Sequence, residues 1–139
     1  MNEADRLREF FAREGPREVL AAYLFGSRAE GRTHAESDVD IGIVLDPAAR
    51  LDAEARFRVR LDLGSALIHA LHQNDVDLVL LNDASPRFAA AVLTEGVRIF
   101  CRDEERLTDV VRDVQLRAAD LEPFLRRMEQ RLLKRLASS

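Results

Sequence analysis

The pattern of apolar and polar positions along the chain predicts alternating helices and short strands. Apolar residues recur every three or four positions in some segments, which is helical spacing. Elsewhere they form short runs without polar alternation, which is typical of strands buried on both faces. In chain order the predicted elements are a helix over residues 3–13, strands over 19–25 and 39–45, a helix over 51–71, a strand over 75–81, a helix over 85–96, a strand over 97–101 and a helix from residue 103 almost to the end.

This order predicts a small α/β (α+β) fold with one mixed sheet of four to five strands and flanking helices. The length of 139 residues suits one domain spanning 1–139, with a C-terminal helical segment at about 103–136. Gly15-Pro16 ends the first helix, and Ser85-Pro86 is an N-cap followed by a proline in the first turn of another.

The terminal helix has an apolar stripe at spacings of four and three residues, made of Leu107, Val111, Val114, Ala118, Leu121, Leu125, Met128 and Leu132. The stripe can pack on the domain's own core or on a partner. Pro123 either starts a new helix capped by Asp120 or kinks a single one. One straight helix over the stripe would be roughly 39 Å long, whereas the radius of gyration should be near ~14 Å. We therefore expect the part beyond Pro123 to be available to a partner or a second copy.

Composition narrows the function classes. The net charge is −4, from 21 basic and 25 acidic side chains, which argues against a nucleic-acid binder with a broad basic face. Trp is absent and Tyr occurs once, so stacking platforms for single strands are scarce. The single cysteine, Cys101, allows no internal disulfide and favours a reducing, cytoplasmic location. No segment has the apolar length of a membrane span or of a signal peptide.

A candidate phosphate site follows the first predicted strand. Gly26 and Ser27 end that strand, and glycine permits close approach of the backbone to a ligand. If a short helix follows, its first amides would point at an anion. Asp38 and Asp40 begin the next strand on one face, roughly 6 to 7 Å apart. Two such carboxylates repel unless a cation lies between them, and Mg²⁺ takes carboxylates together with phosphate oxygens.

A third acid lies in a later strand. Asp77 has apolar neighbours on both sides, and we expect a carboxylate there to be costly unless it is paired or bound to metal. If this strand neighbours the strand over 39–45, three acids converge. Three carboxylates with metal ions and a triphosphate would form a nucleotidyl-transfer site.

Gly26-Ser27, ten intervening residues and Asp38-Val39-Asp40 form the GSx10DxD signature, by which the chain resembles the polymerase-beta-like nucleotidyltransferases. Its length and motif placement resemble the minimal nucleotidyltransferases (MNT). Residues 76–105 also look like the MntA-type antitoxins, which are paired with HEPN-domain toxins. The resemblance covers roughly residues 19–110 and implies the polymerase-beta-like fold.

The resemblance implies an enzyme that transfers AMP from ATP onto a tyrosine of a cognate HEPN ribonuclease toxin and thereby neutralises it. It implies that Gly26 and Ser27 hold the triphosphate and that Asp38, Asp40 and Asp77 bind Mg²⁺. Arg28 follows the motif serine and could neutralise phosphate charge, or it could be a solvated loop arginine.

Two alternatives stay open. One is a non-catalytic antitoxin that acts by direct binding, and the other is a nucleotidyltransferase for a small-molecule hydroxyl. The intact motif disfavours the first, and the lack of an added substrate domain disfavours the second. A zinc site at His69 and His72 has too few ligands at the right spacing.

Overall fold

The computed structural model describes residues 2–26, 39–72 and 75–138. It confirms the order of helices and strands expected from the sequence. The elements are α1 (Glu3–Glu14), β1 (Val19–Phe25), β2 (Val39–Leu45), the 3₁₀ turn η2 (Pro47–Ala49), α2 (Ala53–Leu71), β3 (Val76–Leu80), α3 (Pro86–Glu95), β4 (Val97–Cys101) and α4 (Glu104–Ser138).

The four described strands form one mixed sheet in the order β3-β2-β1-β4. β1 pairs antiparallel with both β2 and β4, whereas β2 pairs parallel with β3. The parallel pair is joined through α2, the long crossover that parallel strands require. The strand over 39–45 therefore neighbours the strand that carries Asp77, as the predicted site needs.

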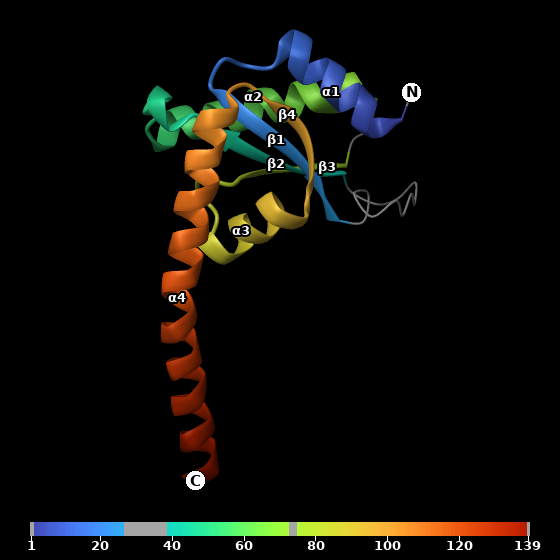
Figure 1. Ribbon diagram of the computed structural model, residues 1–139. Coiled ribbons are helices and arrows are strands. Elements are labelled where there is room, and N and C mark those ends of the chain that lie inside the picture. The colour runs from blue at the N-terminus through green and yellow to red at the C-terminus, as the bar shows by residue number, and fades with distance from the viewer. Residues whose placement is uncertain (1, 27–38, 73–74, 139) are drawn as a thin grey trace.

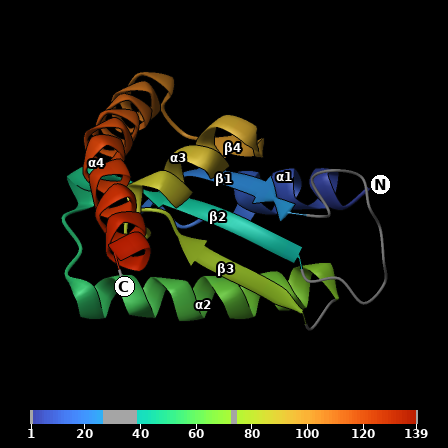
Figure 2. The same cartoon turned by 90° about the horizontal axis from the view of Figure 1, so that it is seen from below.

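Helices cover both faces of this sheet. α1 and α2 lie on one face, and α3 lies on the other with the first half of α4 beside it (Figure 1; Figure 2). The first face holds the larger apolar cluster, and α1 contributes Leu7 and Phe11 to it. The second cluster joins Tyr23 and Val44 of the sheet to Val92 of α3 and Leu107 of α4. Both faces of β1 and β2 are thus buried, which explains their continuous apolar runs.

Side-chain caps define where the helices begin. The carboxylate of Asp52 accepts from Ala55 N at 2.8 Å, and Ser85 Oγ accepts from Phe88 N at 3.3 Å. These contacts satisfy backbone donors that the first turn of a helix leaves without partners. The predicted cap at Ser85 is therefore confirmed.

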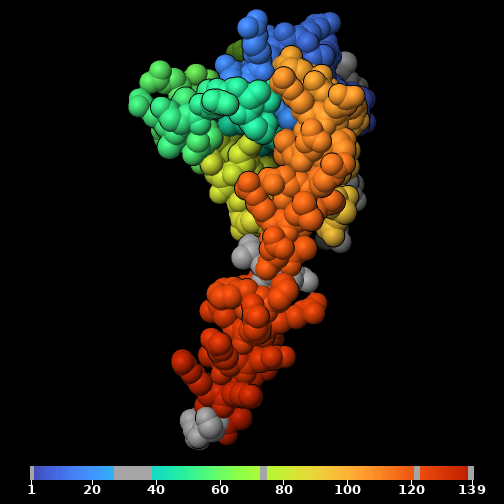
Figure 3. Space-filling view, turned by 60° about the vertical axis from the view of Figure 1, so that its left-hand side comes forward, coloured from blue at the N-terminus to red at the C-terminus, as the bar shows by residue number. Residues whose placement is uncertain are grey.

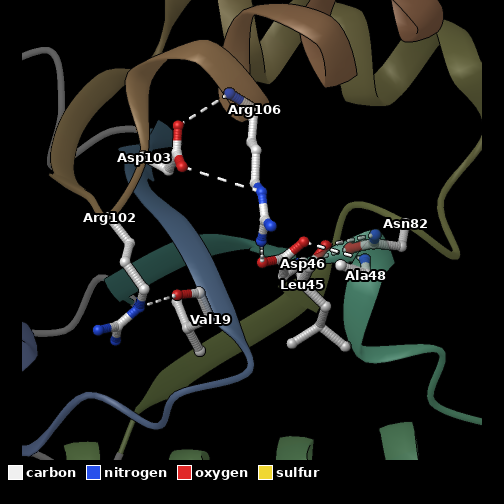
Figure 4. Close-up of polar contacts among 8 residues, drawn as sticks. All are labelled: Val19, Leu45, Asp46, Ala48, Asn82, Arg102, Asp103 and Arg106. Carbon is white, nitrogen blue, oxygen red and sulfur yellow. Dashed lines mark hydrogen bonds and ion pairs between the residues drawn. The ribbon is translucent and has the colours of Figure 1, made fainter.

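Polar contacts fasten the end of the sheet from which α4 departs (Figure 4). Asn82 Oδ1 accepts from Leu45 N at 2.8 Å, and Asn82 Nδ2 donates to Leu45 O at 3.0 Å. Arg102 Nε donates to Val19 O at 3.0 Å, and Arg106 pairs with Asp46 at 2.6 Å. These contacts join the end of β2 to the turn after β3 and to the first turn of α4, and they join the segment before α4 to the start of β1.

α4 is one helix of 35 residues with Pro123 inside it. Of the two alternatives left open for Pro123, the structure shows the single helix that continues through it. Only the first half of α4 lies along the domain, and the remainder extends well clear of it (Figure 1). Its apolar stripe changes from buried Leu107 to exposed Leu125, Met128 and Leu132, which confirms that the part beyond Pro123 does not cover the domain's own core.

Candidate functional site

The end of β1 brings backbone unusually close to a carboxylate. Gly26 has φ of +77°, a conformation that residues with a Cβ rarely adopt. A Cβ placed on Gly26 would also overlap Oδ2 of Asp40. Glycine is therefore required here twice, once for the backbone angle and once for space next to Asp40.

Asp40 and Asp77 lie side by side on the sheet. They are register partners in the parallel pairing of β2 with β3, and Phe25 is the partner of Asp40 on the other side. Partners on adjacent strands point to the same face and are separated by about 4.8 Å between strands. Asp40 is half-buried and Asp77 is exposed, so the face is accessible from solvent at the β3 edge.

Phe25, Asp40 and Asp77 form a row across three neighbouring strands, and this row lies on the face of the sheet that α3 covers. Along β2, Asp40 alternates with Val39 and Ile41, whose side chains belong to the cluster under α1 and α2. Asp40 must therefore point to the opposite side of the sheet. α3 packs on that same side, where Val92 reaches Gly42 of β2.

The structure places three of the six predicted site residues. It brings Gly26, Asp40 and Asp77 together at one end of the sheet. Ser27, Arg28 and Asp38 lie outside the described residues. The expectation that a carboxylate at Asp77 would be costly unless it is paired or bound to metal is wrong, because β3 is an edge strand of the described sheet and its Asp77 side chain is exposed.

The described carboxylates suit a hard cation. Mg²⁺ is bound through one or two carboxylates together with phosphate oxygens and water. Asp40 and Asp77 supply two such groups from neighbouring strands. Among the residues the structure describes, no cluster of three His, Cys, Asp or Glu side chains gathers as a metal site. A third predicted acid, Asp38, lies outside this set.

A small pocket of about 180 Å³ adjoins this row, and sequence reasoning missed it. Phe25 and Phe88 meet edge to face in it, with ring centroids 5.7 Å apart. Gly26 and Glu95 also line it. No sequence spacing could reveal this pocket, because it depends on where α3 crosses β1.

Two titratable side chains on the same sheet face have altered pKa values. Burial raises the pKa of the Tyr23 hydroxyl above its ordinary value. Tyr23 as a whole residue is only 4% exposed. Burial also raises the pKa of the Cys101 thiol. Neither group is therefore primed for nucleophilic chemistry, which agrees with Cys101 being a packing residue.

Comparison with known proteins assigns the family. The family model for polymerase beta nucleotidyltransferases matches residues 5–105. The protein adenylyltransferase MntA of Shewanella oneidensis strain MR-1 is 40% identical over 78 residues. The matching segment amounts to 56% of this chain and 51% of that relative, so the chain spans about half the length of the curated relative it matches.

Solved structures agree on the fold. A toxin–antitoxin with AMP-PNP superposes with a TM-score of 0.62 at 25% identity, covering 98% of this chain and 99% of the other. A tri-AMPylated Shewanella oneidensis HEPN toxin in complex with an MNT antitoxin gives a TM-score of 0.59 at 23% identity, covering 96% and 98%. The second likeness shows the fold alone. Because the family model matches most of the chain, including β1, β2 and β3, the protein belongs to the polymerase beta nucleotidyltransferase family.

Proposed function

We propose that this protein is a Mg²⁺-dependent protein adenylyltransferase that acts as an antitoxin, transferring AMP from ATP to a tyrosine of a cognate HEPN-domain toxin. One observation carries the proposal: Asp40 and Asp77 are register partners on β2 and β3, directly beside Gly26. The similarity to the adenylyltransferase MntA supports the acceptor class. The likeness to a toxin–antitoxin with AMP-PNP supports ATP as the donor.

Each predicted residue has a role in this proposal. Gly26 would let the backbone reach the triphosphate, and Ser27 and Arg28 would contact its oxygens. Asp38, Asp40 and Asp77 would hold Mg²⁺, and the chemistry that this ion would supply is neutralisation of phosphate charge. The toxin forms a hetero-oligomer with this chain in the cytoplasm, a location that the single Cys101 favours. Among the described residues, no helix is long and apolar enough to cross a bilayer.

The reaction balances as a substitution at the α-phosphorus. The tyrosine oxygen forms a bond to that phosphorus, and the bond to the β-phosphate oxygen breaks so that pyrophosphate leaves. The tyrosine proton passes to Asp77, which is exposed at the β3 edge where a protein acceptor can approach. Gly26 and Asp40 lie on the inner side of the same row and position the donor.

The two alternative functions, a non-catalytic antitoxin and a transferase for small hydroxyl compounds, fit the structure less well. A non-catalytic antitoxin would not need a glycine held at φ +77° against Asp40. A transferase for small hydroxyl compounds would need walls around its acceptor, whereas Asp77 lies exposed at the sheet edge.

The test is transfer of labelled AMP from ATP to the candidate toxin in the presence of Mg²⁺. Asp40→Asn should lower transfer by at least ~100-fold, since it removes a metal-binding charge and retains the side-chain shape. Asp62→Asn, an exposed acid on α2, is the matched control and should transfer at the wild-type rate. Wild-type transfer by Asp40→Asn would overturn the site. Toxin neutralisation without any transfer by the wild-type protein would favour the binding-only antitoxin.

A further inference from the structure

A groove lies between α3, the first half of α4 and the end of β2, which is the opposite end of that strand from Asp40. It has a volume of about 390 Å³. Its floor is apolar, with Val44 and Leu81 from the sheet side and Ala89 and Leu93 from α3. Asp109 and Asp113 of α4 stand at its rim. The groove thus offers an apolar floor with acidic groups beside it.

The segment of α4 beyond Pro123, here called the tail (residues 123–138), has the opposite character. Phe124, Met128 and Leu132 are 51%, 52% and 58% exposed. Five basic side chains and one acidic side chain give the segment from residue 123 onward a net charge of +4. Since the whole chain carries −4, the remaining 122 residues carry −8. The tail extends away from its own domain, as Figure 3 shows, so it cannot enter its own groove.

Groove and tail lie on the same face of one helix. An α-helix completes five turns in 18 residues. The residues of α4 that line the groove are Asp109, Val110, Asp113, Val114 and Arg117. Eighteen positions later stand Arg127, Met128, Arg131, Leu132 and Arg135. This face therefore carries two acidic residues, two valines and one basic residue, Arg117, in the first half, and three arginines with two apolar residues in the second.

A face of this kind is complementary to itself when two copies run antiparallel. With the two-fold axis near Asp120, Asp113 faces Arg127 of the second copy and Asp109 faces its Arg131. The same register sets Leu116, which is 59% exposed, opposite Phe124 of the second copy. Each tail then lies along the groove of the other chain. We propose that this protein forms a two-fold dimer in which the tail of each copy occupies the α3–α4 groove of the other.

The two halves of the contact contribute differently. Met128 and Leu132 lose exposed apolar surface against the groove floor, which supplies the main driving force. The carboxylate–arginine pairs select the antiparallel register and are screened by salt. The exposed pair of Asp113 with Arg117 at 3.0 Å within one chain is weak enough to exchange for Arg127 of the second copy. Burial of apolar side chains therefore determines how tightly the dimer forms, and the ion pairs determine the register of the two helices.

Sedimentation of the purified full-length protein tests the proposal. The wild type should have twice the 15.7 kDa mass of one chain at micromolar concentration. Met128→Asp should raise the dissociation constant by at least ~100-fold. Phe57→Asp on α2, where the native side chain is 57% exposed, is the matched control and should remain dimeric. Circular dichroism and thermal unfolding confirm that each variant is folded.

Paired charge reversals give a sharper test. Asp109→Lys with Asp113→Lys should give a monomer, and so should Arg127→Glu with Arg131→Glu. An equimolar mixture of the two double variants should form a 1:1 dimer, since each contact then joins opposite charges. A monomeric wild type, or a mixture that stays monomeric, overturns the proposal. Tail variants that remain dimeric but lose binding to the toxin also overturn it and assign the tail to the toxin. AMP transfer is not the readout, so these outcomes stand apart from the proposed activity.

Discussion

Asp40 of β2 and Asp77 of β3 face each other across the parallel strand pair of the sheet. Both lie near the N-terminal ends of their strands, where β1, running the opposite way, ends at Gly26. The antiparallel β1 is what brings a strand-ending glycine to the same edge as the starts of two parallel strands. The candidate site therefore follows from strand direction as much as from residue identity.

Replacement of Gly26 by alanine should remove AMP transfer and destabilise the protein. The change adds a Cβ at φ +77° that also overlaps Asp40 Oδ2. We expect a cost of about 1–3 kcal/mol in the free energy of unfolding. Gly64→Ala is the control, because nothing lies within 4 Å of a Cβ there and the position is inside α2. It should raise stability by about 0.5–1 kcal/mol, so equal effects of the two changes would contradict the role of Gly26.

Asp77→Asn should abolish transfer with little effect on folding. The side chain is exposed, so neutralising it should change the free energy of unfolding by less than about 0.5 kcal/mol. Urea unfolding and labelled-ATP transfer measure the two effects separately. A large loss of stability without metal would assign Asp77 a structural role instead.

Asn82 should matter for stability and not for transfer. Its side chain makes two hydrogen bonds with the backbone of Leu45, at the end of β2 that is remote from Asp40. Asn82→Ala should lower the free energy of unfolding by about 1–3 kcal/mol. Transfer well below the unfolding temperature should stay at the wild-type rate. A stable Asn82→Ala protein would show that water replaces these contacts.

Stability should fall at alkaline pH through Tyr23. Burial raises its pKa in the folded protein, whereas the unfolded chain releases this proton near pH ~10. The stabilising contribution is thus complete below about pH 10 and is lost as the pH rises towards the folded pKa. Tyr23→Phe should flatten the decline measured by denaturant unfolding above pH ~10. Cys101→Ser separates the contribution of the thiol, whose pKa burial also raises.

Removal of the tail after Glu122 should leave the domain folded. Phe124, Leu125 and Met128 are exposed, so their loss uncovers no core. Compared with the Met128→Asp variant, which should also be monomeric, the thermal unfolding temperature should change by less than about 3 °C, and ATP binding should persist. Calorimetry of the truncated protein measures this. A sharp loss of stability would mean that the tail supports its own domain.

Much of the fold could be predicted because glycine and proline mark where the strands end. Gly26 ends β1 and Asp46-Pro47 closes β2, and both strands have the predicted bounds. The geometry around Pro123 could not be chosen from sequence, since the roughly 3 kcal/mol cost of an interior proline competes with good helix formers on both sides. The exposure of Asp77 was missed because its apolar neighbours suggest a central strand, whereas sheet order makes β3 an edge. Sheet order also determines the Phe25–Phe88 pocket, which no local pattern encodes.

The base of α4 is fastened on two sides, by Arg98 to Glu104 through two 2.8 Å hydrogen bonds and by Arg106 to Asp46. At 1.5 Å per residue the helix is about 52 Å long, so a tilt of about 5° at its base would displace its end by about 4.5 Å. The two ion pairs at its base therefore determine where the helix starts and in which direction it points. Whatever binds its tip is held at a fixed distance and bearing from the strands that carry Asp40 and Asp77.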